Sequence, residues 1–409
     1  MSAAAPRSHD LVLVGATGFA GRLTAEHLAR YAPPTTRVAL AGRSLERLAA
    51  VRAGLGGRAA AWPLVVVDVS DPAAVAALAA STRVVVTTVG PYLRHGLPLV
   101  QACAEAGTGY ADLTGEALFV RRSIDAAHAA ARASGAWIVH SCGFDSVPSD
   151  LGVGLTAARA AADGAGTLAE TVLHVRALRG GLSGGTIDSA RQSLLEAKSD
   201  RNARALVGRS DALVERPPGH GERAWPPPPA VDRDPATGSW QASFVMGAFN
   251  RQVVQRSNSL TGYSYGPEFR YREVLDTGRG AAGVLGAAAH VGGAAALAAG
   301  LWFRPSRAVL DRVLPAPGSG PSERTLQRGR FAFEVLATTT TGARYRTRVA
   351  ADLDPGYRGT AVMLGESGLS LALDDLPGRA GVLTPMVALG SALADRLRTH
   401  GFTVDTERI

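Results

Sequence analysis

The segment that most constrains the fold is VLVGATGFAG, which begins at Val12 and carries three glycines at G-x-x-G-x-x-G spacing. Leu11 to Val14 form a short apolar run, as expected for a parallel strand buried on both faces. The segment after Gly21, RLTAEHLARY, has the apolar spacing of a helix. A strand, a glycine-rich turn and a helix in this order indicate a dinucleotide-binding βαβ unit, whose helix N-terminus faces a pyrophosphate.

Further apolar strands follow at the spacing of repeated βα units. They are expected at residues 37–43, 64–69, 83–92, 109–113 and 137–143, with Ala- and Leu-rich helices between them. Asp71 and Pro72 suit the cap and the first position of one of these helices. Because parallel strands joined by helices need cover on both faces, we predict an α/β fold with a Rossmann-type doubly wound parallel sheet over about residues 1–155.

Beyond residue 155 the pattern of the sequence changes. Thr167–Leu178 alternates like a half-exposed strand, and Phe331–Asp352 has the pattern of a hairpin that turns at Thr341-Gly342. These segments predict a second, α+β domain over residues 156–379, for substrate binding and dimerisation. A C-terminal helix over residues 380–409 is expected to pack back on the first domain.

Charge and cysteine content exclude several classes of function. The net charge of +8 comes almost entirely from scattered arginines, which predicts attraction for anionic ligands or lipid surfaces but no nucleic-acid footprint. Lys198 is the single lysine, so a Walker A loop and a Schiff-base lysine elsewhere are excluded. The Tyr-x-x-x-Lys pair of short-chain dehydrogenases is excluded as well, because position 194 is Leu194. Cys103 and Cys142 lie too far apart for a metal knuckle, so we expect free thiols in a cytoplasmic protein and no metal site.

The end of the second strand indicates which dinucleotide is bound. It reads Gly42-Arg43-Ser44, with no acidic residue before Glu46. An acid here would accept a hydrogen bond from a ribose 2′-hydroxyl, whereas the Arg43 guanidinium and the Ser44 hydroxyl fit a 2′-phosphate. The sequence therefore predicts NADP. Asp68, after the third strand, would either meet the adenine or cap the next turn.

The fourth strand ends at Val89-Gly90-Pro91, where the nicotinamide end of a dinucleotide lies. The complete set of expected cofactor-binding residues is Gly15, Ala16, Thr17, Gly18, Phe19, Gly21, Arg43, Ser44, Asp68, Val89, Gly90 and Pro91. Tyr92, the next residue, is either a proton donor beside the hydride path or an aromatic residue of the core or rim.

The fifth and sixth strands are followed by DLTGE (residues 112–116) and GFDSVPSD (residues 143–150), which should open on the same crevice. Asp145 and Ser146 lie in the second of these motifs and are candidates for catalysis, with helix capping as the alternative. LSGGTIDSA places Thr186 at the start of a further helix, a second N-terminus suited to an anion.

These motifs together resemble one family. GATGFAG, AGR, VGPY, DLTGE, GFDSVPSD, SGGT, FVMGAFNRQVVQRSN, LPAPGSGPSE and LTPMVALGSALADRL occur in the same order in saccharopine dehydrogenase-like oxidoreductases. The chain is most similar to the actinobacterial trans-acting enoyl reductases. The resemblance implies an NADP-binding Rossmann domain and an α+β domain. It also implies reduction of a double bond in a lipid or polyketide intermediate presented by another enzyme.

The resemblance also assigns residues. It implies that Gly15, Thr17, Gly18, Phe19, Gly21 and Arg43 hold the cofactor and that Gly90, Pro91 and Tyr92 line its nicotinamide end. The sequence departs from the family pattern at Ser319, where the pattern has an acidic residue. This difference affects only what the resemblance implies about that loop.

Three functions remain open on the sequence. The first is NADPH-dependent reduction of an activated C=C bond on a carrier-bound acyl chain, with backbone amides or Ser146 steadying the enolate oxygen and Tyr92 or water returning a proton. The second is imine reduction of the saccharopine reductase type, with Arg251 and Arg256 binding a carboxylate. The third is a non-catalytic lipid-surface protein that keeps a Rossmann scaffold.

The segment Gly280–Phe303 carries no formal charge over 24 residues, which is long enough to cross a bilayer. Most of it is Ala and Gly, so a helix that rests on the membrane is favoured over a spanning one. Trp302 and Phe303, beside Arg304 and Arg307, suit an interfacial anchor. A buried helix packed through its small residues is the alternative. The expected location is the cytoplasm, with peripheral contact at the inner membrane face.

Overall fold

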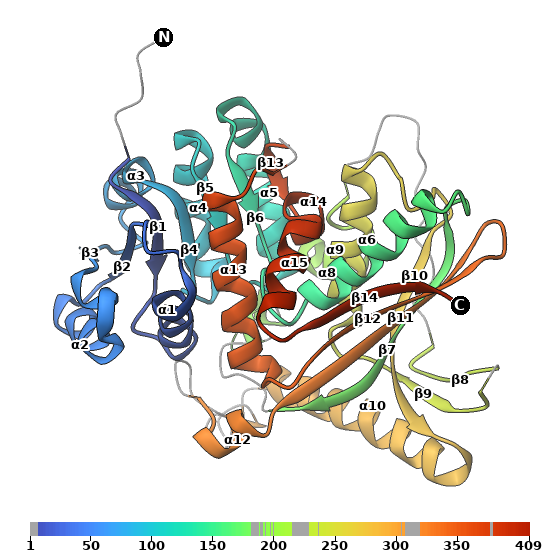
Figure 1. Ribbon diagram of the computed structural model, residues 1–409. Helices are drawn as coiled ribbons and strands as arrows, with labels where there is room; N and C mark the ends of the chain where they lie inside the picture. Colours follow the sequence, from blue (N-terminus) through green and yellow to red (C-terminus); the bar gives the residue numbers. More distant parts are fainter. Residues whose placement is uncertain are drawn as a thin grey trace.

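The computed structural model describes residues 7–180, 188, 191–192, 194–196, 198, 200–214, 229–235, 237–303, 305–306, 320–376 and 379–409. Two seven-stranded sheets lie side by side, with helices around and between them (Figure 1). The longer described helices are α1 (Phe19–Tyr31), α2 (Leu45–Leu55), α3 (Pro72–Ser81), α4 (Tyr92–Ala106), α5 (Ala117–Ser134), α6 (Val147–Ala162), α8 (Arg201–Gly208), α9 (Gly247–Leu260), α10 (Gly280–Trp302), α13 (Thr360–Leu373) and α15 (Gly390–Thr399).

The first sheet is parallel throughout, in the order β13-β6-β5-β4-β1-β2-β3. Its strands are β1 (His9–Val14), β2 (Val38–Gly42), β3 (Leu64–Val66), β4 (Thr82–Thr87), β5 (Gly109–Ala111), β6 (Trp137–Val139) and β13 (Gly381–Leu383). Leu11 and Leu13 pack with α1 and α13 on one face, while Val12 and Val14 pack with α3 and α4 on the other. The run of apolar residues in β1 is thus explained by burial on both faces, and the predicted Rossmann-type fold is confirmed.

The residue before Pro72 stabilises the start of α3. The Asp71 carboxylate accepts hydrogen bonds from the backbone N–H groups of Ala73 (2.9 Å) and Ala74 (3.2 Å). These two donors have no acceptor within the first turn of a helix, so the side chain stabilises the N-terminus. The predicted cap is confirmed.

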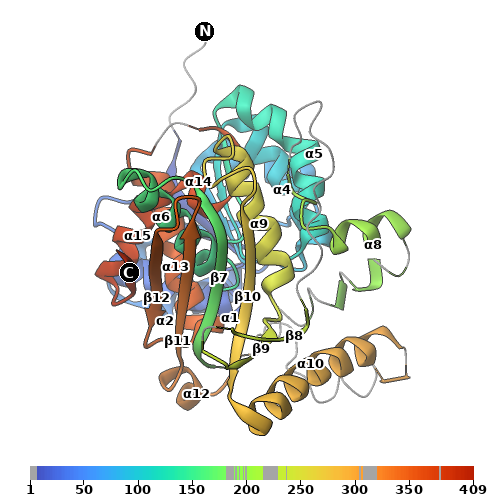
Figure 2. The same ribbon diagram turned by 90° about the vertical axis from the view of Figure 1, so that its right-hand side faces the viewer.

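The second sheet is mixed, in the order β14-β12-β11-β7-β10-β9-β8 (Figure 2). Its strands are β7 (Leu168–Arg179), β8 (Val231–Arg233), β9 (Trp240–Ser243), β10 (Arg270–Gly278), β11 (Arg330–Thr339), β12 (Arg344–Ala351) and β14 (Thr403–Arg408). Strands β7 and β10 are parallel, and the other pairs are antiparallel. The hairpin of β11 and β12 turns at Gly342, whose φ of +84° suits glycine. The α+β character predicted for this half is confirmed.

The C-terminal segment differs from its prediction. A single helix over residues 380–409 is wrong: β13 adds to the first sheet beside β6, α14 (Pro385–Ala388) and α15 follow, and β14 pairs with β12 in the second sheet. Gly381, Gly390 and Gly401 have φ values of +130°, +47° and +81°, which interrupt a helix. The helix α13, inside the range expected for the second domain, packs on α1 and on strands β4 and β5 of the first sheet.

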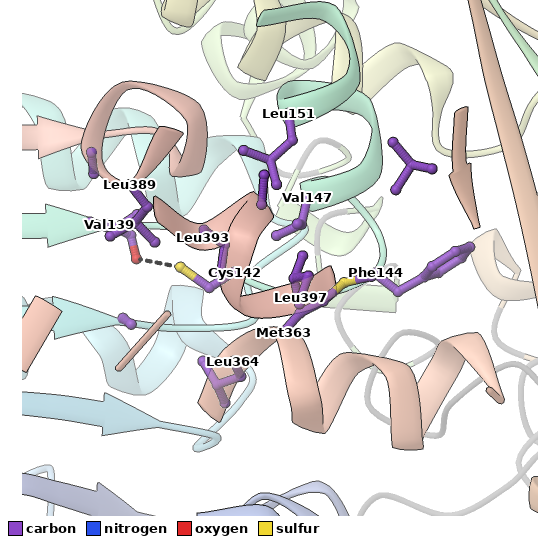
Figure 3. Close-up of a cluster of buried hydrophobic side chains, with 14 of the residues drawn as sticks. Val139, Cys142, Phe144, Val147, Leu151, Met363, Leu364, Leu389, Leu393 and Leu397 are labelled. Carbon is purple, nitrogen blue, oxygen red and sulfur yellow. Dashed lines mark hydrogen bonds between the residues drawn. The ribbon is translucent and has the colours of Figure 1, made fainter. Parts of the chain in front are cut away.

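A shared apolar core joins the two halves behind the end of β6 (Figure 3). Its side chains are at most 6% exposed, and they come from the segment after β6 and from α6, α13 and α15: Cys142, Phe144, Val147, Leu151, Met363, Leu364, Leu389, Leu393 and Leu397. Both Cys142 and Cys103 are free thiols, as predicted, and burial raises the pKa of each. This core fixes the GFDSVPSD segment between the sheets.

Candidate dinucleotide and catalytic site

The glycine-rich turn follows β1 with the geometry that its spacing predicts. Gly15 has a φ of +85°, and its carbonyl accepts a hydrogen bond from the Gly18 N–H at 3.0 Å. A Cβ on Gly21 would lie 2.1 Å from the Gly15 oxygen, so α1 packs directly on the turn. No side chain of the described chain caps α1 at Gly18. Its first N–H groups therefore suit an anion such as a pyrophosphate, and the residues present fit a dinucleotide.

The end of β4 lies against this turn. A Cβ on Gly15 would meet the Thr88 hydroxyl at 2.8 Å and a Val89 methyl at 2.9 Å, and Thr88 Oγ1 donates to the Gly15 carbonyl at 3.1 Å. Gly90 and Pro91 then lead into α4. The structure thus brings the first turn and the Val89-Gly90-Pro91 segment together, as expected for a ligand that crosses from β1 to β4.

The predicted 2′-phosphate site lies in the turn between β2 and α2. Arg43 is exposed, and the described residues give its guanidinium no hydrogen bond or ion pair. Ser44 caps α2, accepting from the Arg47 N–H at 3.3 Å. Asp68 accepts from the backbone N–H and hydroxyl of Ser70, which lower its pKa, so it caps its own turn. Arg43 is the side chain best suited to a phosphate.

Two further arginines lie near this turn and were not singled out in the sequence. Arg22 of α1 and Arg47 of α2 line a cavity of about 470 Å³ together with Thr17. Arg22 and Arg47 come from two helices and line the same cavity, which Glu26 also lines, because α1 and α2 are in contact. They add positive charge beside the predicted phosphate site.

Phe19 and Ala16 have packing roles in the turn. Ala16 is fully buried. The Phe19 ring meets Tyr357 edge-on with centroids 4.8 Å apart, and a Cβ on Gly320 would lie within 2.2 Å of the ring. The Phe19 ring therefore holds the C-terminal half against the turn. This contact spans over 300 residues, which places it beyond any local sequence pattern.

Tyr92 lies at the start of α4 and is 5% exposed. Its hydroxyl donates to the Thr87 carbonyl and accepts from the Leu113 N–H, both at 3.1 Å. Burial raises its pKa well above the usual value. These contacts favour a structural role, whereas its role as proton donor stays a prediction.

The two acids of DLTGE organise the same edge of the sheet. Glu116 accepts from the backbone N–H groups of Tyr92 (3.0 Å) and Leu93 (2.8 Å), which places a carboxylate at the N-terminus of α4. Asp112 accepts from His140 Nδ1, from the Tyr110 hydroxyl and from the Thr114 and Ser141 N–H groups. Both acids are fully buried. They fix the ends of β4, β5 and β6 relative to one another.

Asp145 differs from these acids. It follows β6, is half-buried, and makes no hydrogen bond within the described chain. Burial raises its pKa to about 6. The segments after β4, β5 and β6 adjoin near it: the Leu113 N–H donates to the Tyr92 hydroxyl, and a Cβ on Gly143 would lie 2.8 Å from the Leu113 side chain. A partly accessible carboxyl that binds a proton near neutral pH is suited to acid–base chemistry.

Ser146, the third catalytic candidate, is 1% exposed and belongs to a polar network. Its hydroxyl donates to Asn250 Oδ1 at 2.9 Å, and Asn250 Nδ2 donates to Glu273 at 3.1 Å. Glu273 also accepts from the Tyr271 hydroxyl at 2.7 Å. The network links α6 to α9 and β10, so it holds the second half against the Asp145 segment.

Arg251 and Arg256, both on α9, have different surroundings. Arg256 is 1% exposed and donates to the carbonyls of Leu213 (2.7 Å) and Val382 (2.5 Å), so it is a structural residue. Arg251 is half-buried, burial lowers its pKa, and its Nε has no hydrogen-bond partner among the residues that the structure describes. Arg251 is therefore the one of the pair that suits a ligand. Thr186 and Ser319 lie outside the described residues.

Comparisons with known proteins give the family. A family model described as the saccharopine dehydrogenase NADP binding domain matches residues 11–139. The chain is 48% identical over 421 residues to a Mycobacterium tuberculosis protein named putative trans-acting enoyl reductase. It is 46% identical over 416 residues to a Mycobacterium bovis protein named trans-acting enoyl reductase. Each match covers 99% of both chains.

A solved structure shares the fold. Apo saccharopine dehydrogenase (L-Glu forming) from Saccharomyces cerevisiae superposes with a TM-score of 0.55 at 14% identity, covering 98% of this chain and 99% of that one. The Rossmann turn, the family match and the full-length relatives agree with each other. The chain belongs to the saccharopine dehydrogenase-like oxidoreductases, in the branch that contains the mycobacterial trans-acting enoyl reductases, and is an NADP-dependent oxidoreductase.

Proposed function

We propose that this protein reduces a C=C bond conjugated to a carbonyl in an acyl or polyketide chain that a partner synthase presents. The observation that carries the proposal is the full-length identity of 46–48% to proteins named trans-acting enoyl reductase. A partly accessible acid, Asp145, supports it further, because it lies in the segment after β6, near the sheet edge where a nicotinamide would be expected.

Bound NADPH would supply the hydride for the β-carbon of the substrate. The chain's own contribution is then to steady the enolate oxygen and to deliver a proton to the α-carbon. The N-terminus of α6, which begins after Ser146, would offer the oxygen the Ser149 N–H, because the Val147 N–H already donates to the Gly143 carbonyl and Pro148 has no N–H. We assign the delivery of this proton to the Asp145 side chain rather than to Tyr92.

Arg251 supports a second candidate, reduction of an imine that bears a carboxylate. A half-buried guanidinium whose Nε has no hydrogen-bond partner among the described residues would bind the carboxylate of an amino-acid substrate. Oxidation of NADPH separates the candidates when it is followed with an enoyl thioester on an acyl carrier protein and, in parallel, with an amino acid plus an aldehyde. Turnover of the thioester alone supports enoyl reduction. Turnover of the imine alone overturns it, and turnover of neither favours a non-catalytic scaffold.

The NADP preference gives a test of Arg43. Replacing Arg43 with Ala removes one charge-assisted phosphate contact and should weaken NADPH binding by about 1.5–3 kcal/mol. NADH affinity should be almost unchanged, because NADH has no 2′-phosphate. Isothermal titration of both dinucleotides measures the change. Equal affinities for NADPH and NADH in the unaltered protein would contradict the assignment.

The contacts of Tyr92 predict the behaviour of Tyr92→Phe. Losing the bonds to Thr87 and Leu113 should lower the free energy of unfolding by about 0.5–1.5 kcal/mol, because a buried N–H loses its acceptor. Turnover should stay within a few-fold of the unaltered protein. Chemical denaturation and steady-state rates give both quantities, and a 10²-fold loss of turnover would make Tyr92 the proton donor.

The apolar segment forms α10, a helix that projects from the second sheet (Figure 2). It is long and apolar enough to cross a bilayer, with a mean hydropathy of 1.6, and its apolar window is 11% buried. The expected alternative of a buried helix is therefore wrong. Gly283 packs on Gly278 and Trp240, and most other side chains face outward, including Leu285 (69% exposed) and Phe303 (60%).

A spanning α10 conflicts with the topology. The strands on either side of it, β10 and β11, both pair with β7 and so lie on one side of any membrane. The chain from Phe303 to Gly320 is too short to cross back as a helix, and an irregular chain does not cross lipid. We propose that α10 rests on the membrane surface, close to lipid-linked substrates.

Co-sedimentation with liposomes tests this contact. The full chain should pellet with anionic liposomes at low salt, and a Leu285→Ser/Phe303→Ser variant should pellet several-fold less, because two exposed apolar side chains are lost. Circular dichroism of the variant serves as the folding control. Equal pelleting of the two proteins, or pelleting of neither, would show that α10 does not bind lipid; a concentration-dependent dimer would then point to a second copy as its cover.

A further inference from the structure

A cluster of two histidines and a glutamate lies toward the C-terminal end of α1, away from the glycine-rich turn at its N-terminus. His27 of α1, Glu366 of α13 and His400, which follows α15, place one ligand atom each within 4.8 Å of one another. Glu366 Oε1 is 2.7 Å from His27 Nε2 and 2.9 Å from His400 Nε2. His27 and Glu366 are buried, and His400 is partly exposed. The three residues are far apart in sequence, and the fold alone brings them together.

The surroundings of the cluster hold the carboxylate in one orientation. Arg396 NH1 donates to Glu366 Oε2 at 2.9 Å, and the same guanidinium binds Asp374 through two further bonds. Because Arg396 engages only Oε2, Oε1 stays directed at the two imidazoles. Although burial acts in the opposite direction, hydrogen bonds from His27, His400 and Arg396 lower the pKa of Glu366 to about 2.

The cluster also borders an open cavity of about 350 Å³. His27, His400, Leu23, Tyr31 and Val362 are among its lining residues. The Tyr31 ring stands edge-on to His400 with centroids 4.6 Å apart. A Cβ on Gly365 would lie 2.7 Å from the His27 ring, so glycine at this position leaves room for the imidazole. An ion or a water molecule therefore has access to the cluster from solvent.

We propose that His27 Nε2, Glu366 Oε1 and His400 Nε2 bind a divalent first-row transition metal ion, with Zn²⁺ the best match. Two imidazole nitrogens and one carboxylate oxygen are a known zinc ligand set, and a water from the cavity would complete a tetrahedron. Zinc bonds of about 2.0–2.2 Å require the ligand atoms to separate by about half an ångström from their present hydrogen-bonded spacing. Rotation of the partly exposed His400 supplies its share of this movement, and the buried His27 and Glu366 side chains must supply the rest.

The proposed site would join three elements. The ion would tie α13 and the end of α15 to α1, the helix whose N-terminus forms the glycine-rich turn. The ion would thus stabilise the packing of the C-terminal segment against the dinucleotide-binding half, and it would not contact Asp145.

The test uses the full chain, stripped with a chelator and dialysed against Zn²⁺, with metal counted by mass spectrometry. One equivalent of Zn²⁺ should be retained, Co²⁺ should give the visible absorption of a low-coordinate site, and Zn²⁺ should raise the melting temperature. His400→Asn should lower Zn²⁺ affinity at least 10-fold. Asparagine is tolerated at a helix C-terminus, so this variant should fold.

His95→Gln is the matched control, since His95 is exposed on α4 and distant from the cluster in sequence. It should retain the full equivalent of metal. Retention of no metal by the unaltered chain, or equal retention by His400→Asn, would overturn the proposal and leave a hydrogen-bonded cluster.

Discussion

Replacing Asp145 with Asn should lower turnover about 10²-fold or more at pH 6, with NADPH affinity almost unchanged. The amide is close to the carboxyl in size but cannot deliver a proton, and general acid catalysis contributes about 10²–10⁴-fold. Asp145 lies in the segment between β6 and α6 and makes no hydrogen bond within the described chain, so its replacement should not destabilise the fold. Steady-state rates with an enoyl thioester, together with NADPH titrations, measure the two effects.

The protonation state of Asp145 sets the direction in which the rate should change with pH. Burial raises the pKa of Asp145 to about 6, so the protonated form dominates below pH 6 and declines as the pH rises. A rate that needs the protonated carboxyl should therefore be level at low pH and fall about 10-fold per pH unit well above 6. Asp145→Asn should remove this dependence.

Asp150 offers a matched control, because burial also raises its pKa to about 6. Its carboxylate accepts from Ser257 Oγ and from the Met386 N–H, so it is a structural acid. Asp150→Asn should lower the melting temperature and keep the pH profile. A profile that survives in Asp145→Asn, or disappears in Asp150→Asn, would show that Asp145 is not the proton donor.

The Rossmann half could be predicted because its signals are local. The glycine spacing after β1, the buried apolar strands and the Asp71 cap each depend on residues close in sequence. The shared edge at which the segments after β4, β5 and β6 meet could be predicted as well, since the carboxyl ends of parallel strands lie at one edge of a sheet. Arg43 stands where its place after β2 predicted.

The roles of several residues depended on partners distant in sequence. Tyr92 is paired with Leu113, Ser146 with Asn250 and Phe19 with Tyr357, contacts that no periodicity reveals. The C-terminal segment was also misjudged, because three buried residues of β13 are too few to signal a strand. Asp145 and Ser146 are neighbours in sequence, and only their contacts distinguish them. The Asp145 carboxyl makes no hydrogen bond within the described chain, whereas the Ser146 hydroxyl is held by Asn250.

The second large effect is expected for Gly21→Ala. A Cβ at this position would lie 2.1 Å from the Gly15 carbonyl oxygen and 2.8 Å from its carbon, both backbone atoms that no side-chain rotation can move. The helix α1 must therefore shift away from the turn, which should cost about 1–3 kcal/mol of the free energy of unfolding. The same shift withdraws the helix N-terminus from the pyrophosphate. We expect NADPH affinity to fall about 10²-fold or more, because several charge-assisted contacts are lost together.

Gly54→Ala is the matched control for this substitution. Gly54 is an exposed glycine of the neighbouring helix α2, and a Cβ there would meet nothing within 4 Å. The control should gain about 0.5–1 kcal/mol of stability, since alanine is the better helix former, and should bind NADPH normally. Thermal unfolding and NADPH titration of both variants separate helix propensity from packing. Normal NADPH binding by Gly21→Ala would mean that the turn tolerates displacement of α1 and that the dinucleotide is held elsewhere.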